Sequence, residues 1–451
     1  MTIRSIAIIG GGPGGLLTAR RLQQLAPESL QVDLYEAAPE VGGKVLTRQF
    51  SRAPVSYEAG AAELYDYSAV GPDPLRELVA ELGLGTFPMR GDAVILDGRL
   101  YRTSQELNAE ARRELKRFSR FAREAISPAE YYESDWRADL EDPLARASFR
   151  ALLNRLRDPL ARRYIETAIH SDLATEPHRT SAAYGLQNWL MNEPGYMSLY
   201  GIRGGNQRLV RELARRLHAG LHTRHRVTRL RPLPDHSFEL TIHHPDGAIR
   251  RQADAVVVAL PVNAIRGIAY DHPALDTAVL AHHRHFDHPA HYLRISTLFR
   301  TPFWRKHLAD SYFMHDAFGG CCLYDESDRD GAAGHGVIGW LLGGEAAATH
   351  SNQTDDELIR TVLESWPAML GDARAEFLEA RVTRWIGTVN ALPGGRTPLP
   401  PEKRHQPDPV AFPNFHFVGD YLFDSTLNGV MDSAEWAAET IVEDFPPSAR
   451  K

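Results

Sequence analysis

Apolar residues alternate along the chain between stretches typical of buried strands and stretches with helical spacing. Residues Ile3–Ile9 are mostly apolar and β-branched, which indicates a strand buried on both faces. A glycine-rich turn follows, and Leu16–Leu25 then has the apolar spacing of a helix. Val32–Glu36 is the next strand-like stretch. Together these segments predict one complete βαβ unit.

Between Ser104 and about Tyr200 the pattern changes. Stretches such as Ala109–Ile126 and Pro143–Ala168 are charged and amphipathic, with few β-branched residues. This composition predicts a helical insertion, which we expect to cover a ligand-binding site. The remaining segments predict a β-meander, two buried strands and a final helix, at Val227–Ile249, Ala253–Leu260, Phe415–Val418 and from Gly429 onward.

A chain of 451 residues is too long for one ordinary core, so we expect two intertwined domains. The fold class predicted is α/β, with a Rossmann-type nucleotide-binding domain and an interleaved α+β substrate domain that carries the helical cap. The nucleotide-binding domain is expected in three pieces, 1–70, 200–285 and 385–451. The substrate domain is expected at 71–199 and 286–384.

Composition narrows the functional classes. The net charge is −7, with acidic and basic residues mixed along the chain, which argues against nucleic acid or an anionic membrane as a partner. No apolar run reaches the ~18 residues of a membrane span, and the start of the chain lacks the features of a signal peptide. The cysteines are only Cys321 and Cys322, and the histidines show no metal-ligand spacing. We therefore expect a cytoplasmic protein without a metal site.

The glycine turn after the first strand has the pattern G-x-G-x-x-G over residues 10–15. Gly10 permits the tight turn, Gly12 lets the backbone approach a pyrophosphate, and Gly15 lets helix and strand pack closely. The helix that begins near Pro13 and Gly14 then presents free N–H groups and a positive dipole to the phosphates. Glu36 follows Gly15 by 21 residues, at the end of the second strand, where it can accept hydrogen bonds from a ribose. A carboxylate there favours FAD or NAD over NADP.

Four segments in order resemble the flavin-containing amine oxidase family, which includes amine and amino-acid oxidases, protoporphyrinogen oxidase and carotenoid desaturases. They are Val41-Gly42-Gly43-Lys44, Ile202–Leu209, Ala253–Pro261, and Phe417–Asp420 with Asn428–Ala434. The resemblance implies noncovalent FAD, with Asp420 at the ribityl or pyrophosphate region and the helix after Gly429 facing the flavin ring. The cofactor-binding residues that we expect are Gly10, Gly12, Pro13, Gly14, Gly15, Glu36, Gly43, Lys44, Gly60, Ala61, Val227, Trp385, Gly419, Asp420, Gly429 and Val430.

The sequence departs from the family pattern at three places. Amine oxidases often place a lysine over the flavin, and Arg294 occupies the resembling position here; it cannot lose its proton and could bind an acidic group, orient a water or pair with Glu63. The aromatic cage of monoamine oxidases is replaced by Ala391 and Val430. Glu63 stands where many amino-acid oxidases have an arginine, and it could attract a cationic or amide group or act as a general base. An ordinary ion pair remains the alternative for both Arg294 and Glu63.

No second complete G-x-G-x-x-G follows a strand, which favours an oxidase or desaturase over an enzyme reduced by NAD(P)H. We expect hydride removal from a C–N bond of an amine, amide or amino-acid-derived substrate, giving an imine, with O₂ reduced to hydrogen peroxide. Glu63 and Arg294 are the candidate catalytic residues. The alternatives are a C–C desaturase or porphyrinogen-type oxidase, and a protein that binds FAD structurally. The partner expected is a small-molecule substrate, and a homodimer is left open.

Overall fold

The computed structural model describes residues 5–26, 30–133, 142–193, 195–329, 334–390, 399–423 and 425–444. The chain divides into two compact units. The first contains residues 1–45, 207–287 and 399–451, and the second contains residues 46–206 and 288–398. Each unit is therefore assembled from segments that lie far apart in the sequence, and each has its own core.

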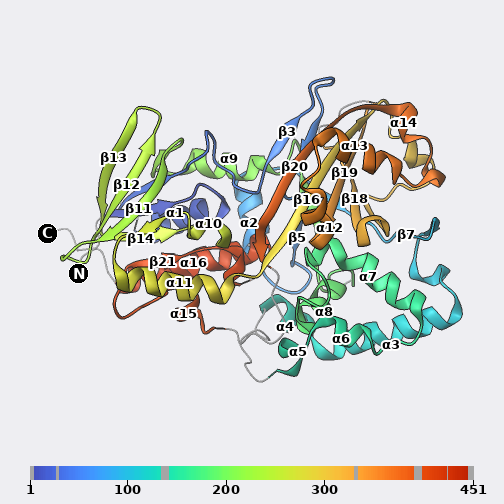
Figure 1. Ribbon diagram of the computed structural model, residues 1–451, viewed down its shortest axis with the longest axis horizontal. Coiled ribbons are helices and arrows are strands. Elements are labelled where there is room, and N and C mark those ends of the chain that lie inside the picture. Colours follow the sequence, from blue (N-terminus) through green and yellow to red (C-terminus); the bar gives the residue numbers. More distant parts are fainter. Residues whose placement is uncertain are drawn as a thin grey trace. The chain divides into compact units, whose positions relative to one another are not determined.

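The first unit is built on a five-stranded parallel sheet (Figure 1). The strands, in spatial order, are β10 (Gly220–His222), β2 (Gln31–Tyr35), β1 (Ser5–Ile9), β14 (Ala255–Val258) and β21 (Phe415–Phe417). Helix α1 (Pro13–Leu25) packs against both α9 (Gln207–Arg216) and α16 (Leu427–Asp444). A buried parallel sheet covered by helices is the Rossmann-type α/β arrangement that the sequence predicts.

A second, four-stranded sheet completes this unit. The strands β11 (Arg226–Pro232), β12 (Phe238–His244) and β13 (Gly247–Ala253) form the meander, and β15 (Ala269–Tyr270) pairs with β11 in parallel. The helices that follow are α10 (Val262–Ile265), α11 (Pro273–Phe286) and α15 (Pro401–His405). The final helix begins at Leu427, two residues before the predicted start at Gly429, because Thr426 Oγ1 accepts from the Gly429 N–H group and caps the first turn.

The second unit is built on a seven-stranded mixed sheet. In spatial order its strands are β20 (Phe377–Asn390), β16 (Pro289–Phe299), β19 (Gly336–Gly343), β18 (Cys321–Asp325), β17 (Tyr312–His315), β7 (Val94–Leu96) and β8 (Arg99–Tyr101). Alternate residues of these strands pack on two different cores: Ile295 and Trp340 belong to one, and Cys322 and Tyr324 to the other. The second of these cores also contains the helical insertion.

The predicted helical insertion is present. It consists of α3 (Ala109–Ala125), α4 (Pro128–Glu133), α5 (Pro143–Arg146), α6 (Phe149–Leu153), α7 (Pro159–Leu173) and α8 (Ala182–Leu190). Side chains of Asn108, Ser148, Asp158 and Ser181 cap the starts of four of them. Other elements of this unit are β3 (Thr47–Gln49), β4 (Ser56–Glu58), β5 (Leu64–Asp66), β6 (Thr86–Met89), β9 (Ser198–Ile202), α2 (Pro74–Glu81), α12 (Gly344–His350), α13 (Asp355–Glu364) and α14 (Ala373–Glu376).

The unit boundaries lie at different residues from those expected. Residues 46–70, 200–206 and 385–398, which we expected in the nucleotide-binding domain, group with the second unit, and residues 286–287 group with the first. Strand pairing accounts for this, because β3 pairs with β4, β5 pairs with β9, and β20 pairs along its length with β16. Each of these partners also belongs to the second unit.

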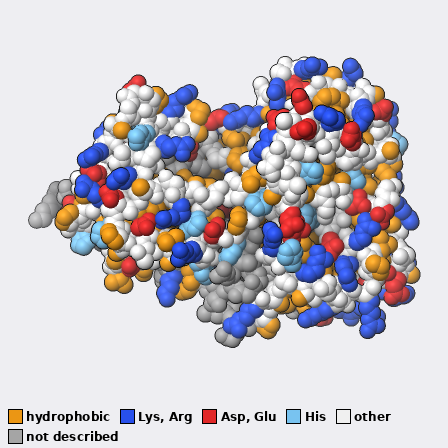
Figure 2. Space-filling view, in the orientation of Figure 1, with side chains coloured by type: hydrophobic (Ala, Val, Ile, Leu, Met, Phe, Trp, Pro, Cys, Tyr) orange, Lys and Arg blue, Asp and Glu red, His pale blue; other side chains and the backbone are white. Residues whose placement is uncertain are grey.

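The described residues form no extended patch of one charge on the surface in view. Lysine, arginine, aspartate and glutamate side chains are interspersed over both units on this face (Figure 2), which agrees with the mixed charge of the sequence. Among the described residues, none of the helices combines the length and the apolar character that crossing a bilayer requires. The same residues contain no group of three or more histidine, cysteine or acidic side chains that could hold a metal ion.

His282, on α11, is a buried titratable group in the core of the first unit. The residue is 5% exposed, and its ring stacks on Phe417 with 4.3 Å between centroids. Neither ring nitrogen has a hydrogen-bond partner among the described residues. Burial, together with the positive charge of nearby histidines such as His405, lowers the pKa of His282 from 6.5 to about 3.

The free energy of unfolding should therefore decrease as the pH falls from 6.5 toward 3, because the unfolded His282 takes up a proton that the folded one excludes. The loss approaches about 1.4 kcal/mol per pH unit. His282→Phe preserves the ring and removes this dependence. Urea unfolding of both proteins at several pH values measures the difference. Parallel stability curves for the two proteins would show that His282 does not titrate as described.

Candidate functional site

The turn between β1 and α1 requires glycine at two positions for steric reasons. Gly10 has φ +112°, and a Cβ atom there would lie 2.4 Å from the carbonyl oxygen of Ala259. A Cβ on Gly15 would lie 2.0 Å from the carbonyl oxygen of Gly10. These contacts hold α1 close against the sheet, in the way that the spacing of the glycines predicts.

Gly12 differs from these two glycines because space remains open beside it. Its backbone is extended, with φ −76°, and the nearest atom to a methyl group added there would be the Cα atom of Gly43 at 3.7 Å. Gly12 is the N-cap of α1, no side chain caps this helix, and Pro13 occupies the first turn without an acidic neighbour. Among the described residues, no side chain caps or neutralises the start of α1, which is the setting in which the N–H groups of a helix N-terminus bind anions such as a pyrophosphate.

Packing around Gly14 brings the C-terminal motif to the same turn. A Cβ on Gly14 would lie 3.1 Å from Val418 Cγ1 and 3.5 Å from Val430 Cγ1. Gly419 donates its N–H to Ser433 Oγ at 3.1 Å, and Gly429 lies in the first turn of α16. The N-terminal and C-terminal motifs are therefore neighbours in the first unit, although they are about 400 residues apart in the sequence.

Glu36 lies at the carboxyl end of β2 and is partly exposed. Its Oε2 atom accepts from the Gly11 N–H at 2.7 Å, and its Oε1 atom accepts from the Ala38 N–H at 2.6 Å. Each carboxylate oxygen retains a lone pair for a further donor. The side chain thus sits against the glycine turn, in a position from which it can accept from ribose hydroxyls.

Lys44 and Asp420 form an ion pair with 2.6 Å between Nζ and Oδ2. Asp420 Oδ1 also accepts from the Tyr421 N–H at 2.9 Å. Gly43, immediately before Lys44, has φ +54°, which favours glycine. The two ionic groups that we expect to bind cofactor are thus together, whereas Val227 is 6% exposed and belongs to the hydrophobic core.

In the second unit, the segment from Glu58 to Glu63 connects β4 to β5. Gly60 and Ala61 are partly exposed. Trp385, on β20, donates its indole N–H to the carbonyl oxygen of Ala59 at 2.7 Å. Trp385 therefore lies in the same unit as Gly60 and Ala61, and it is bonded to Ala59, the residue directly before them.

Four buried charged side chains form a cluster around the end of β4. They are Glu58, Arg294, Glu326 and Arg329, which are 0%, 1%, 1% and 3% exposed. Arg294 forms an ion pair with Glu326, and Arg329 pairs with Glu58 at 2.9 Å. Burial, which outweighs the opposing charge of Arg329, raises the pKa of Glu58 to about 7.

Arg294 therefore has a defined carboxylate partner. Besides Glu326, its Nε atom donates to the carbonyl oxygen of Glu58, and its guanidinium lies 5.2 Å from the ring centroid of Tyr324. Glu63, the partner considered from the sequence, contributes only a weaker electrostatic interaction. Of the roles considered for Arg294 from the sequence, the structure shows an ion pair with an acidic group, and this group is Glu326.

Strand register places Arg294 on a polar face of the large sheet. Tyr292 and Arg294 alternate with core residues on β16, Arg294 is opposite Leu341 of β19, and Leu341 is opposite Cys322 of β18. Tyr324 shares that face because it is two residues beyond Cys322. The face thus carries a guanidinium, a thiol and two phenols.

Two carboxyl groups complete this face. The Tyr324 hydroxyl bonds to the Glu63 carboxyl, and burial raises the pKa of Glu63 against the opposing charge of Arg294. Asp172, in the last turn of α7, accepts from the Tyr292 hydroxyl through its main-chain oxygen at 3.4 Å. Burial and the negative charge of Glu63 raise the pKa of Asp172 well above its usual range. The arrangement therefore favours a cationic or hydrogen-bond-donating group.

Asp172, Glu58, Glu326 and Arg329 escaped the sequence analysis. Asp172 follows His170 and Ser171 in the last turn of α7, so its local sequence did not distinguish it from an ordinary polar helix end. The neighbouring sequence does not distinguish the other three residues. Glu58 and Arg329, for example, form their ion pair across more than 260 residues of sequence. Ala391, the other expected cage position, lies outside the described residues.

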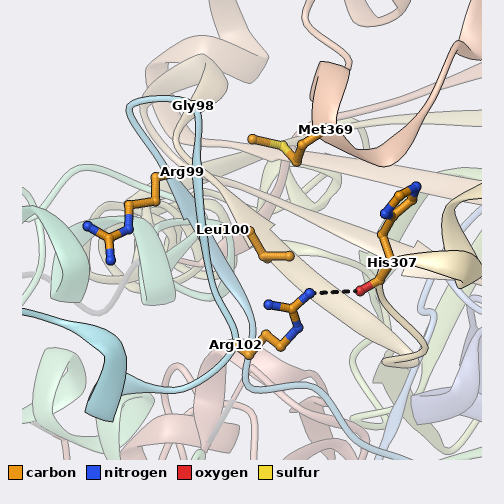
Figure 3. Close-up of a pocket in the computed structure, with 6 residues that line it drawn as sticks. All are labelled: Gly98, Arg99, Leu100, Arg102, His307 and Met369. Carbon is orange, nitrogen blue, oxygen red and sulfur yellow. Dashed lines mark hydrogen bonds between the residues drawn. The ribbon is translucent and has the colours of Figure 1, made fainter.

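A surface hollow of about 350 Å³ lies elsewhere in the second unit (Figure 3). It is lined by Gly98, Arg99, Leu100, Arg102, His307 and Met369. Arg102 donates to the main-chain oxygen of His307 at 3.4 Å across it. The hollow contains none of the carboxyl groups or tyrosines described above, so it is no candidate for the reaction site.

Comparison with known proteins agrees with this geometry. The family model for flavin-containing amine oxidoreductases matches residues 13–442. A flavin-dependent L-tryptophan oxidase, RebO of Lentzea aerocolonigenes, is 23% identical over 337 residues, which are 67% of each chain. Among solved structures, a putrescine oxidase triple mutant has a TM-score of 0.77 and 22% identity, covering 98% of this chain and 99% of its own.

Two further structures share the fold. Cyclohexylamine oxidase from Brevibacterium oxydans IH-35A has a TM-score of 0.74 and 19% identity, covering 98% of this chain and 99% of its own. A putative protoporphyrinogen oxidase from Exiguobacterium sp. 255-15 has a TM-score of 0.72 and 17% identity, with coverage of 98% and 100%. The glycine turn, the position of Glu36 and the match over most of the chain lead to one conclusion: this protein belongs to the flavin-containing amine oxidoreductase family and is an FAD-dependent oxidoreductase.

Proposed function

We propose that the protein oxidises an amine, amide or amino-acid-derived substrate at a C–N bond, giving an imine and passing the electrons to O₂. The single observation that carries this proposal is the carboxyl pair of Glu63 and Asp172 on the tyrosine-bearing sheet face. Burial raises the pKa of both carboxyl groups, so a cationic amine beside them would favour their ionised form and would be attracted more strongly than in bulk solvent. The same groups would disfavour a substrate that binds through a carboxylate alone.

The residues proposed for the ADP half of FAD are Gly12, the first turn of α1, and Glu36. Gly12 leaves room for the pyrophosphate, the helix start supplies N–H donors, and Glu36 accepts from the ribose. For the flavin half we propose Lys44, Asp420 and the start of α16. FAD supplies the hydride acceptor and the route by which electrons reach oxygen.

In this reaction the protein accepts one proton from the substrate and orients the substrate. Hydride can leave the carbon only when the neighbouring nitrogen has a free lone pair, so the ammonium form must first lose a proton. We propose that a Glu63 carboxylate oxygen accepts this proton, since its raised pKa brings it closer to that of an amine. The overall balance is R₂CH–NH₂ + O₂ → R₂C=NH + H₂O₂.

The decisive test follows the flavin absorbance of the purified holoenzyme without oxygen. Bleaching by amines or amino acids but not by NADH, with recovery and peroxide on admitting air, is expected. Rapid bleaching by NADH would overturn the oxidase proposal. If no amine or amino acid bleaches the flavin and the enzyme instead oxidises a C–C bond of a porphyrinogen or polyene, the desaturase-type reaction would replace the proposal. A putative protoporphyrinogen oxidase shares the fold of this chain.

Two glycine variants separate cofactor binding from folding. Gly12→Ala should fold normally, because its methyl group meets no atom closer than 3.7 Å, but it should lose FAD because the methyl group occupies the pyrophosphate position. Gly15→Ala should instead be destabilised by about 1–3 kcal/mol or more, because its methyl group collides with the carbonyl oxygen of Gly10. Flavin content per chain and thermal unfolding measure the two effects. Full FAD occupancy in folded Gly12→Ala would contradict the assignment.

Glu63→Gln should keep FAD and lower kcat for amines by roughly 10²-fold, because the amide cannot accept the proton. In the wild type, kcat should rise with pH through a value above the ordinary 4.5 of glutamate, since burial raises the pKa of Glu63. This limb of the profile should vanish in the variant. Glu176→Gln is the matched control: it removes another partly buried carboxylate, paired with His170, in the same unit. Wild-type turnover by Glu63→Gln would remove Glu63 from the reaction.

A further inference from the structure

A short turn in the first unit carries Asp420, and the residue before this turn is tied to a helix. The turn is the 3₁₀ helix η6 (Asp420–Leu422), which begins after Gly419. Gly419 donates its N–H at 3.1 Å to Oγ of Ser433, a buried residue of α16. A Cβ atom on Gly419 would lie 2.5 Å from Cε1 of the Tyr421 ring, so the turn is folded tightly on itself. Moving the Gly419 backbone would therefore break its bond to the buried hydroxyl.

The Ser433 hydroxyl also contacts a buried imidazole. His405 is the last residue of α15, and its Nε2 atom lies 3.1 Å from Ser433 Oγ, within hydrogen-bond distance. The His405 ring stacks on Trp436 with 4.2 Å between centroids and 22° between the ring planes. A serine hydroxyl can accept one hydrogen bond while making another, so it links the Gly419 N–H group to His405. The stacked indole fixes the plane of the imidazole and hence the direction of this link.

The residue before His405 contacts the other end of the turn. Arg404 is buried, and its Nη1 atom donates to Leu422 O at 3.5 Å. Its guanidinium also lies 5.5 Å from the ring centroid of Phe423, and its Nε atom donates to Leu399 O. Two consecutive residues of α15 thus act on opposite ends of η6, one through α16 and the other directly.

Asp420 lies between these two points of attachment. Its Oδ2 atom is 2.6 Å from Lys44 Nζ, and its Oδ1 atom accepts from the Tyr421 N–H at 2.9 Å. The lysine side chain is about one-third exposed, and an ion pair in contact with water contributes little to holding a carboxylate in one place. The position of the Asp420 carboxylate therefore depends on the backbone turn that carries it.

We propose that Arg404, His405 and Ser433 are positioning residues for FAD, which hold η6 so that its carboxylate is oriented before the cofactor binds. This role rests on the proposed function, in which Asp420 binds the flavin half of FAD. None of the three residues needs to touch the cofactor, because each acts through the backbone of η6 or of the residue before it. A carboxylate that is held in place in advance loses less entropy on binding, so these residues raise the affinity for FAD.

The main test compares His405→Phe with His405→Gln in the purified holoenzyme. Phenylalanine keeps a buried ring against Trp436 but cannot bond to Ser433, whereas the side-chain amide of glutamine can replace the imidazole nitrogen. We expect His405→Phe to bind FAD roughly 10- to 100-fold more weakly, and His405→Gln to recover most of this loss. The fluorescence of flavin released on dilution gives the dissociation constant without any substrate.

A double-mutant cycle distinguishes positioning from a general loss of stability. In an Asp420→Asn background, His405→Phe should weaken FAD binding little further, because the carboxylate that it orients is already gone. Ser433→Ala should weaken FAD binding about as much as His405→Phe, and the two changes should not be additive. Any loss of thermal stability caused by His405→Phe should persist in every background. Additive effects of His405→Phe and Asp420→Asn on FAD affinity would contradict the positioning role.

The matched control is His282→Phe. It removes another buried histidine of the same unit, and the ring nitrogens of His282 bond to no described residue. The control should change stability while leaving the affinity for FAD unchanged. An equal loss of affinity in His282→Phe and His405→Phe would overturn the proposal, since the loss of any buried imidazole would then be sufficient.

A second variant keeps the proposal testable if His405→Phe does not fold. Arg404→Lys keeps the positive charge but loses the planar guanidinium, and it should also weaken FAD binding only while Asp420 is present. Folded Arg404→Lys and Ser433→Ala proteins with wild-type affinity would overturn the positioning role. Wild-type affinity in Asp420→Asn would instead overturn the assignment of Asp420 to FAD, and the positioning role with it. A failure of every amine to reduce the flavin would overturn only the proposed reaction.

Discussion

The pairing of Glu58 with Arg329 is the constraint on which the second unit's site depends. Both groups are almost completely removed from water, so each must be neutralised where it lies. The Arg329 guanidinium also donates to the main-chain oxygen of Ala62. The Glu58 carboxylate also accepts from the Asn206 N–H and from the Thr47 hydroxyl. The hydrogen bonds that neutralise these buried charges therefore also fix the position of the backbone. Asn206 and Arg329, which are 148 and 271 residues from Glu58, thus meet around one short stretch of chain.

The first unit depends on a different constraint, which is steric. Gly10 and Gly15 let α1 begin in close contact with the end of β1, because a side chain at either position would collide with a carbonyl oxygen. Gly12 adds an opening where the other glycines leave no space. The glycine turn thus depends on the absence of side chains. The polar face of the large sheet depends on their presence, with Tyr324 placed by strand register beside Glu63, and Asp172 at the end of α7.

Much of the first unit could be predicted because its signals are local. Residue spacing within about 30 residues is enough to recognise the glycine turn, Glu36 and the β-meander. The partner of Arg294 could not be predicted, since Glu326 and Glu63 are equally acidic in the sequence and only strand register distinguishes them. The assignment of residues 46–70 to the nucleotide-binding domain failed to anticipate that β3, β4 and β5 pair within the second unit. Long-range pairing of strands leaves no mark in composition.

Glu36 has a consequence for how the protein is assembled. Its carboxylate already accepts from Gly11 and Ala38 of its own chain, so the glycine turn is shaped by internal hydrogen bonds. A turn that is ordered in advance loses little conformational entropy when the nucleotide arrives. The apoprotein should accordingly behave as a preformed receptor, able to take up FAD after synthesis is complete, so that folding of this part of the chain need not wait for the supply of the vitamin-derived coenzyme.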